Sequence, residues 1–135
     1  MRALWVFIAM ACLSHPVGAF AENWPAYSAE KAGSPELHRC LGANPSSVEE
    51  GECLSKDYAR ENRRMEAAFA ESMKGSSAAE KVQRTKAQQA WKTFRRENCA
   101  VRGLNPGSGM AIFYFGCLVR ETITRRTELT DNWDY

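Results

Sequence analysis

The chain has 135 residues, with 18 Lys and Arg against 16 Asp and Glu, and a formal net charge of +2. This near-balance excludes the strong basic excess that is typical of a nucleic-acid-binding domain. The length allows one domain with a modest core and marginal stability.

The first residues predict an export signal. Arg2 precedes an apolar run from Ala3 to Leu13, and the stretch "AFA" that ends at Ala21 supplies the small residues that a signal peptidase reads. The run is too short to span a bilayer, which takes about 20 residues. We therefore expect cleavage after Ala21 and a periplasmic or secreted protein with no transmembrane segment. The mature chain is then close to neutral, because the segment removed carries one basic residue and no acid.

An alternative makes Cys12 the lipid-modified first residue of a lipoprotein, since "IAMAC" ends with a small residue before the cysteine. Ala9 stands where a larger aliphatic residue is usual, and the apolar run before Cys12 is very short. The sequence favours a cleaved signal without a lipid anchor.

Residues 22–33 carry Pro and Gly without a sustained period, and we expect them to form a loose N-terminal arm. In "SPELHRCLGAN", Ser34 can cap a short helix that has Pro35 in its first position and Gly42 near its end. His38 lies on this helix as a lone histidine, which favours a surface position over a catalytic one.

A second helix is predicted to begin at a capping box of Ser47 and Glu50, and to run to Lys74, before Gly75. The acidic residues that suit its positive start are Glu49, Glu50 and Glu52. Its apolar stripe consists of Leu54, Tyr58, Met65, Phe69 and Met73. Glu61 and Asn62 interrupt that stripe, and the charges of the helix are mixed in sign, which argues against binding to a membrane surface.

A third helix is predicted to begin at a capping box of Ser77 and Glu80 and to run to about Asn98. It contains the stretch "KAQQAWKTFRRENC", and one stripe of it carries Gln88, Trp91, Arg95 and Cys99.

That stripe mixes an aromatic residue with polar ones, so it has two interpretations. In the favoured one, Trp91 and Phe94 belong to the core, and Gln88 and Arg95 bond to carbonyls and carboxylates of neighbouring helices. In the other, Arg95 and Arg126 present a polar patch to a partner.

The stretch "RGLNPGSG" predicts a loop, and "MAIFYFGCLVRETITRRTELT" after it predicts a fourth helix. The segment from Ile112 to Phe115 alone would also suit a short strand, but Ile112, Phe115, Val119 and Ile123 keep helical spacing. Residues 131–135, "DNWDY", are expected to fray. The predicted fold is all-α: a small antiparallel helical bundle over residues 34–130, with three main helices and a short N-terminal one.

The mature chain keeps four cysteines, Cys40, Cys53, Cys99 and Cys117. An even number in an exported chain predicts two disulfides, while the lack of a Cys-x-x-Cys motif argues against a metal site. We favour Cys40–Cys53 and Cys99–Cys117, because each pair closes a short loop across a turn. Crossed pairing between helices stays geometrically open.

Three segments follow the first two cysteines in this order: the run "AQQAWKTFRRENC", the glycine-rich loop and the run "CLVRETITRRTEL". This arrangement resembles the LprI-type lysozyme inhibitor N-terminal domain family of exported bacterial proteins. The positions that match its motifs are Ala87, Gln88, Trp91, Phe94, Arg95, Cys99, Cys117, Thr122, Arg126 and Leu129.

The chain departs from the family pattern on its second predicted helix. The family often has Asp-x-x-Leu-Asn-x-x-Tyr there, and the aligned residues are Tyr58, Glu61, Asn62 and Met65. Only Asn62 agrees. Arg96 stands where the family often has an acidic residue. These differences concern the partner contacts of that helix more than the fold.

No pair of carboxylates across a cleft, activated nucleophile or cofactor-binding loop is recognisable, so we expect neither catalysis nor a cofactor. The resemblance implies a binding protein that inhibits a lysozyme-type muramidase or another envelope protein. The alternative is an envelope structural or adaptor protein with no inhibitory role. For a basic lysozyme, the candidate contacts are Glu49, Glu50 and Glu52, ahead of Asp131 and Asp134 in the tail. The sequence does not determine the oligomeric state.

Overall fold

The computed structural model describes residues 33–104, 107 and 109–131. The expected export signal, the Cys12 alternative, the expected arm up to residue 32 and residues 132–135 of the expected tail lie outside these ranges. Within them the chain forms four helices and no strand: α2 (Pro35–Leu41), α3 (Ser47–Ser72), α4 (Ala78–Arg102) and α5 (Met110–Thr130). The prediction of an all-α bundle is confirmed, and the ambiguous segment 112–115 is helical.

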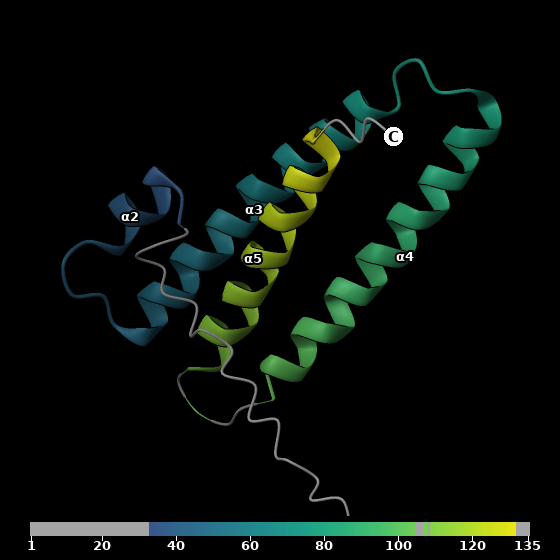
Figure 1. Ribbon diagram of the computed structural model, residues 1–135. Coiled ribbons are helices and arrows are strands. Elements are labelled where there is room, and N and C mark those ends of the chain that lie inside the picture. Colours follow the sequence, from purple (N-terminus) through teal and green to yellow (C-terminus); the bar gives the residue numbers. More distant parts are fainter. Residues whose placement is uncertain (1–32, 105–106, 108, 132–135) are drawn as a thin grey trace, which may run out of the picture.

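The long helices follow one another in alternating directions, so that α3 and α5 point the same way (Figure 1). The most extensive packing joins α3 to α5, α4 packs mainly on α5, and α2 packs on α3. Helix α5 is therefore covered on more than one side. This explains why four consecutive residues of it, Gly116 to Val119, are buried.

Local capping sets the helix starts. The Ser34 side chain accepts a hydrogen bond from the Leu37 N–H, Pro35 follows it, and Gly42 ends α2 with a φ of +59° that favours glycine. Ser77 and Glu80 form the expected capping box of α4. These predictions are confirmed.

The predicted start of α3 is wrong by one residue. The capping box is formed by Ser46 and Glu49, because Ser46 keeps an extended backbone while Ser47 is already helical. The predicted ends also shift. Helix α3 stops at Ser72, whose hydroxyl donates to the Phe69 carbonyl at 2.8 Å, and not at Lys74.

Helix α4 continues past Asn98 to Arg102. No helix-breaking residue occurs between Asn98 and Gly103, and the Gly103 N–H bonds back to the carbonyls of Cys99 and Ala100.

Two apolar clusters make up most of the core, and each includes at least one cysteine of a disulfide. One contains the buried residues Leu37, Cys53 and Leu54 under the partly buried Leu41, Ile112 and Phe115. The other contains Cys99, Cys117 and Leu118, packed by Tyr58, Tyr114 and Phe115. The disulfides are Cys40–Cys53 and Cys99–Cys117, with Cα–Cα distances of 5.7 and 5.5 Å, so the favoured pairing is confirmed.

A close approach of α3 to α5 depends on a glycine. A Cβ atom added to Gly51 would lie 2.9 Å from the Cβ atom of Ala111, closer than two carbon atoms can pack. A side chain at this position would therefore push the first turns of the two helices apart. None of the described helices is both long and apolar enough to cross a membrane.

Candidate functional site

Helix α4 is held to the rest of the bundle by a layer of polar side chains. Its first ten residues, 78–87, are all exposed, and its buried residues are Gln88, Arg95 and Cys99. Figure 1 shows α4 standing farther from α5 at its first turns than at its last. Contact with the bundle therefore begins at Gln88.

Arg95 is the centre of this layer and is 6% exposed. Its Nη1 donates to Asn62 Oδ1 at 3.0 Å and to Thr122 Oγ1 at 2.8 Å, which connects α4 to both α3 and α5. Its guanidinium carbon also lies 4.7 Å from the ring centre of Trp91 and 5.2 Å from that of Tyr58. Two neutral oxygens and two aromatic rings thus surround the buried cation, an environment that suits the planar guanidinium better than an ammonium.

Gln88 continues the layer one helical turn beyond Trp91. Its Nε2 donates to the Met65 sulfur at 2.9 Å, and its Oε1 accepts from Arg125 Nε at 3.1 Å. Arg125 also lies over the Trp91 ring, with its guanidinium carbon 5.7 Å from the ring centre. Gln88 and Arg95 do bond to neighbouring helices, but the expected kind of partner is largely wrong: the Asn62 oxygen is a carbonyl, whereas the other partners are a hydroxyl, a sulfur and a guanidinium.

Two carboxylates lie at core positions of α3, and the sequence interpretation missed both. Asp57 is fully buried and accepts from the Ser34 hydroxyl at 2.6 Å and from Arg60 at 2.7 Å. Glu61 is 2% exposed and is paired with Arg64 and Arg126. The one signal was their spacing of three and four residues from Leu54 and Met65, which places all four on one face.

The alternative interpretation, a contact patch of Arg95 and Arg126, is wrong for Arg95, which is buried. Arg126 Nε lies 3.1 Å from Glu61 Oε2, in an ion pair between α5 and α3 whose angle is unsuited to a hydrogen bond. Arg126 thus joins two helices of the bundle, but its side chain stays 36% exposed.

The aromatic pair of α4 does not behave as predicted. Phe94 is 55% exposed, so its placement in the core is wrong, and Trp91 is only half-buried between Arg95 and Arg125. The reason is that α4 is an outer helix with one covered side, and Phe94 lies off that side. Of the remaining motif positions, Thr122 is fully buried and Leu129 is partly buried.

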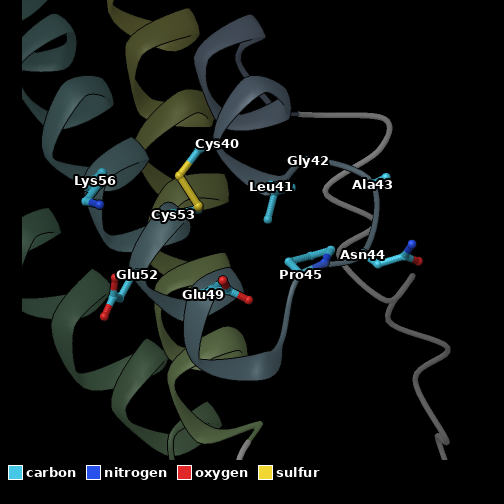
Figure 2. Close-up of a pocket in the computed structure, with 10 residues that line it drawn as sticks. All are labelled: Cys40, Leu41, Gly42, Ala43, Asn44, Pro45, Glu49, Glu52, Cys53 and Lys56. Carbon is cyan, nitrogen blue, oxygen red and sulfur yellow. A yellow bond between two sulfur atoms is a disulfide. The ribbon is translucent and has the colours of Figure 1, made fainter.

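The acidic residues proposed as partner contacts lie beside a groove near the start of α3. Figure 2 shows this groove between the Cys40–Cys53 disulfide, the loop from Gly42 to Pro45 and the first turns of α3. It has a volume of about 420 Å³, and its charged lining residues are Glu49, Glu52 and Lys56. Glu50 is not among its lining residues.

The two glutamates of the groove differ in their hydrogen bonds to the rest of the protein. Glu49 Oε2 accepts from the Ser46 hydroxyl at 2.7 Å and from the Ser46 N–H at 2.8 Å. These bonds lower the pKa of Glu49, so its charge persists to acidic pH. Glu52 is exposed and, among the described residues, has no hydrogen bond or ion pair. Glu52 is therefore the carboxylate available to a partner.

The described residues contain no cluster of three or more His, Cys, Asp or Glu side chains that could hold a metal ion. His38 is exposed on α2, as predicted.

A family model described as "Lysozyme inhibitor LprI" matches residues 40–129, two thirds of the chain. The chain belongs to the LprI family. The match runs from the first cysteine of the framework to Leu129 and includes both the polar layer and the acidic groove. No curated protein and no solved structure shows a significant match.

Proposed function

We propose that this LprI protein is exported and binds a lysozyme-type muramidase, slowing it without turning over substrate. The observation that carries the proposal is the family match over residues 40–129, since the family is one of lysozyme inhibitors. Two disulfides and the bundle that the four described helices form also support it. A rigid surface loses little conformational entropy on binding, which favours tight association.

Charge complementarity supports the acidic groove as the part of the surface that a lysozyme contacts. Common lysozymes are strongly basic, whereas this chain is close to neutral overall, so attraction has to come from a local group of acids. Glu49, Glu50 and Glu52 supply such a group at the start of α3. The proposed partner is therefore a protein, and no cofactor takes part.

The test is a turbidity assay of cell-wall lysis, with mature protein (residues 22–135) added in molar excess over several lysozyme types. We expect slower lysis by at least one type, and no lysis by the protein alone. Reduced and alkylated protein is the matched control, and the oxidised sample is checked for both disulfides by non-reducing peptide mapping. If no lysozyme is slowed, the envelope-adaptor function replaces this proposal.

Export is tested separately by the intact mass of the protein recovered from the producing cell. Cleavage after Ala21 predicts a chain that begins at Glu22 and lacks lipid. A mass that corresponds to a diacylated chain beginning at Cys12 would instead establish the lipoprotein.

A further inference from the structure

Exposed apolar side chains gather at one end of the bundle. Of the seven large apolar residues that are exposed in the described part of the chain, five belong to this end: Val48, Val101, Leu104, Met110 and Phe113. Val48 lies at the start of α3, and the others lie at the end of α4 or the start of α5 and beside the connection between them. The other two, Val82 and Phe94, lie farther back along α4. A concentration of this kind on a small soluble protein marks an interaction site.

Two apolar hollows lie within this end. The first, about 400 Å³, lies between α3 and α5, and its apolar lining is Val48, Gly51, Ala111 and Phe115. The second, about 330 Å³, lies between α4 and α5 and is lined by Ala100, Gly103, Met110, Ala111, Tyr114 and Phe115. Both include Ala111 and Phe115, so they are neighbours across α5. Small residues at Gly51, Ala100, Gly103 and Ala111 leave the space that forms them.

The first hollow is continuous with the acidic groove. Glu52 and Lys56 line both, so one surface runs from the loop after α2, across the first turns of α3, to the start of α5. We call this surface the end face and define it by Glu49, Glu52, Val48, Ala111, Phe115 and Met110. It has an apolar centre and a charged rim, which is the usual anatomy of a protein interface.

The charges of the rim are unequal on its two sides. The α3 side has three acidic residues and one basic one: Glu49, Glu50, Glu52 and Lys56. The α4 side carries the basic residue Arg102. A positively charged partner would therefore dock with its basic groups toward α3. Two copies of this face would bring together two surfaces that each carry more acids than bases, which favours a basic partner over a second copy of this chain.

We propose that the end face is the contact surface for the basic muramidase: an apolar side chain of the enzyme enters the hollow of Val48, Ala111 and Phe115, and a neighbouring Lys or Arg pairs with Glu52. The identity of the partner rests on the proposed function. The location of the contact rests on the hollows, the exposed apolar residues and the available carboxylate.

The experiment measures the affinity of c-type lysozyme for the mature protein by calorimetry, and compares Val48→Lys with Val82→Lys. Both valines are exposed, at 67% and 56%, and each lies in the first two turns of a long helix, but only Val48 lines the hollow. We expect Val48→Lys to weaken binding about ten-fold or more, as for a residue at the centre of an interface. Val82→Lys is expected to stay within about two-fold of the wild type, since it lies outside the end face.

Two further variants separate apolar contact from charge. Val48→Glu also places a charge in the hollow but restores attraction to a basic partner, so we expect a smaller loss than for Val48→Lys. Glu52→Lys is expected to weaken binding and to flatten its dependence on salt concentration. Thermal melts of all variants check that the fold is retained.

The outcomes distinguish this inference from the proposed function. If lysozyme binds but Val48→Lys and Val82→Lys lose the same affinity, or amide shifts on titration map to another surface, the end face is wrong and the inhibitor proposal stands. If no lysozyme type binds, both fall. If sedimentation shows a dimer that Val48→Lys abolishes, the end face is a self-interface and the inference is overturned.

Discussion

Helices α3 and α4 both pack on α5, but they do so by different means. In the α3–α5 contact, Ile112 and Phe115 pack against the cluster that contains Leu54, and the backbones come together at Gly51 and Ala111. The α4 contact is made of hydrogen bonds and stacked rings around Arg95, with the Cys99–Cys117 disulfide near the end of the helix. The α3–α5 contact depends on buried apolar area and on the shape of the two helices. The α4 contact depends on the direction of individual hydrogen bonds.

The two kinds of contact differ in strength. A fully buried Leu or Val contributes about 1.5–3 kcal/mol through the hydrophobic effect, whereas an intramolecular hydrogen bond contributes about 1 kcal/mol net. Helix α4 is therefore the part of the bundle expected to open at the lowest free energy, and its exposed first ten residues should open first.

The largest effect is expected in the apolar contact. Leu54→Ala should lower the free energy of unfolding by about 3–4 kcal/mol, because Leu54 is fully buried and the change leaves a cavity. Denaturant melts would measure the loss. Leu104→Ala is the matched control, since Leu104 is 77% exposed and its loss should stay under about 0.5 kcal/mol. Equal losses would mean that the contact of α3 with α5 is not the main source of stability.

Removing the second disulfide should separate α4 from the other helices. Cys99→Ser with Cys117→Ser opens a crosslink between residues 18 apart, worth about 3 kcal/mol in the chain-entropy model. Removing Cys40–Cys53, which spans 13 residues, should cost a similar amount overall but leave α4 in place. Amide hydrogen exchange distinguishes the two: only the first double variant should deprotect α4 while α3 stays protected. Uniform deprotection in both would contradict a separately opening α4.

Trp91→Ala tests the polar layer. A fully buried Trp costs about 3–5 kcal/mol, and because Trp91 is half-buried we expect about 2 kcal/mol from lost area and lost stacking on Arg95 and Arg125. Phe94→Ala, one turn away and mostly exposed, serves as the control and should change stability by less than about 0.5 kcal/mol. Chemical denaturation of both variants measures the difference. A wild-type midpoint for Trp91→Ala would show that the ring contributes only to the surface.

The smallest effects concern the two capping boxes. Ser46→Ala should cost about 1 kcal/mol of global stability, whereas Ser77→Ala should cost less, because α4 can fray over residues 78–87 without losing a buried contact. Hydrogen exchange in the first turn of each helix measures the local effect. A larger global loss for Ser77→Ala would mean that the start of α4 is packed.

These boxes also add a pH dependence of known sign. Hydrogen bonds from Ser46 lower the pKa of Glu49, and those from Ser77 lower the pKa of Glu80. Their contribution is complete above the unfolded-state pKa of about 4.5 and is lost as the pH falls through the lower folded-state pKa. The cost of Ser46→Ala should therefore be larger at pH 7 than at pH 3. A pH-independent cost would mean that the Glu49 carboxylate takes no part.

What could be predicted from the sequence was local. Ser34, Pro35 and Gly42 specify the bounds of α2 by themselves, and each disulfide closes a loop short enough to favour its own pair. The one-residue error at Ser46 arose because both serines have a glutamate three positions later, and side-chain spacing alone does not choose between them.

The features that the sequence could not predict depend on how the helices pack on one another. Phe94 has the spacing of a core residue, but α4 packs mainly on one neighbour, α5, so only one side of α4 is covered. In the sequence, Glu61 interrupts an apolar stripe. Its ion-pair partner on α5, Arg126, lies 65 positions later, so the sequence does not show that the two residues pair. The acidic groove was partly predicted, through Glu49 and Glu52, whereas the hollows beside it need the close packing of α3 on α5.

The positions of the two disulfides also determine how the molecule responds to proteases. Cys40–Cys53 brackets the connection between α2 and α3, and Cys99–Cys117 brackets the one between α4 and α5. A cut in either connection leaves both ends covalently attached, so the protein stays in one piece. Among the connections between the described helices, the one from α3 to α4, residues 73–77, alone lacks such a bracket. A single cleavage there would divide the four described helices into two pairs, each held together by its own disulfide.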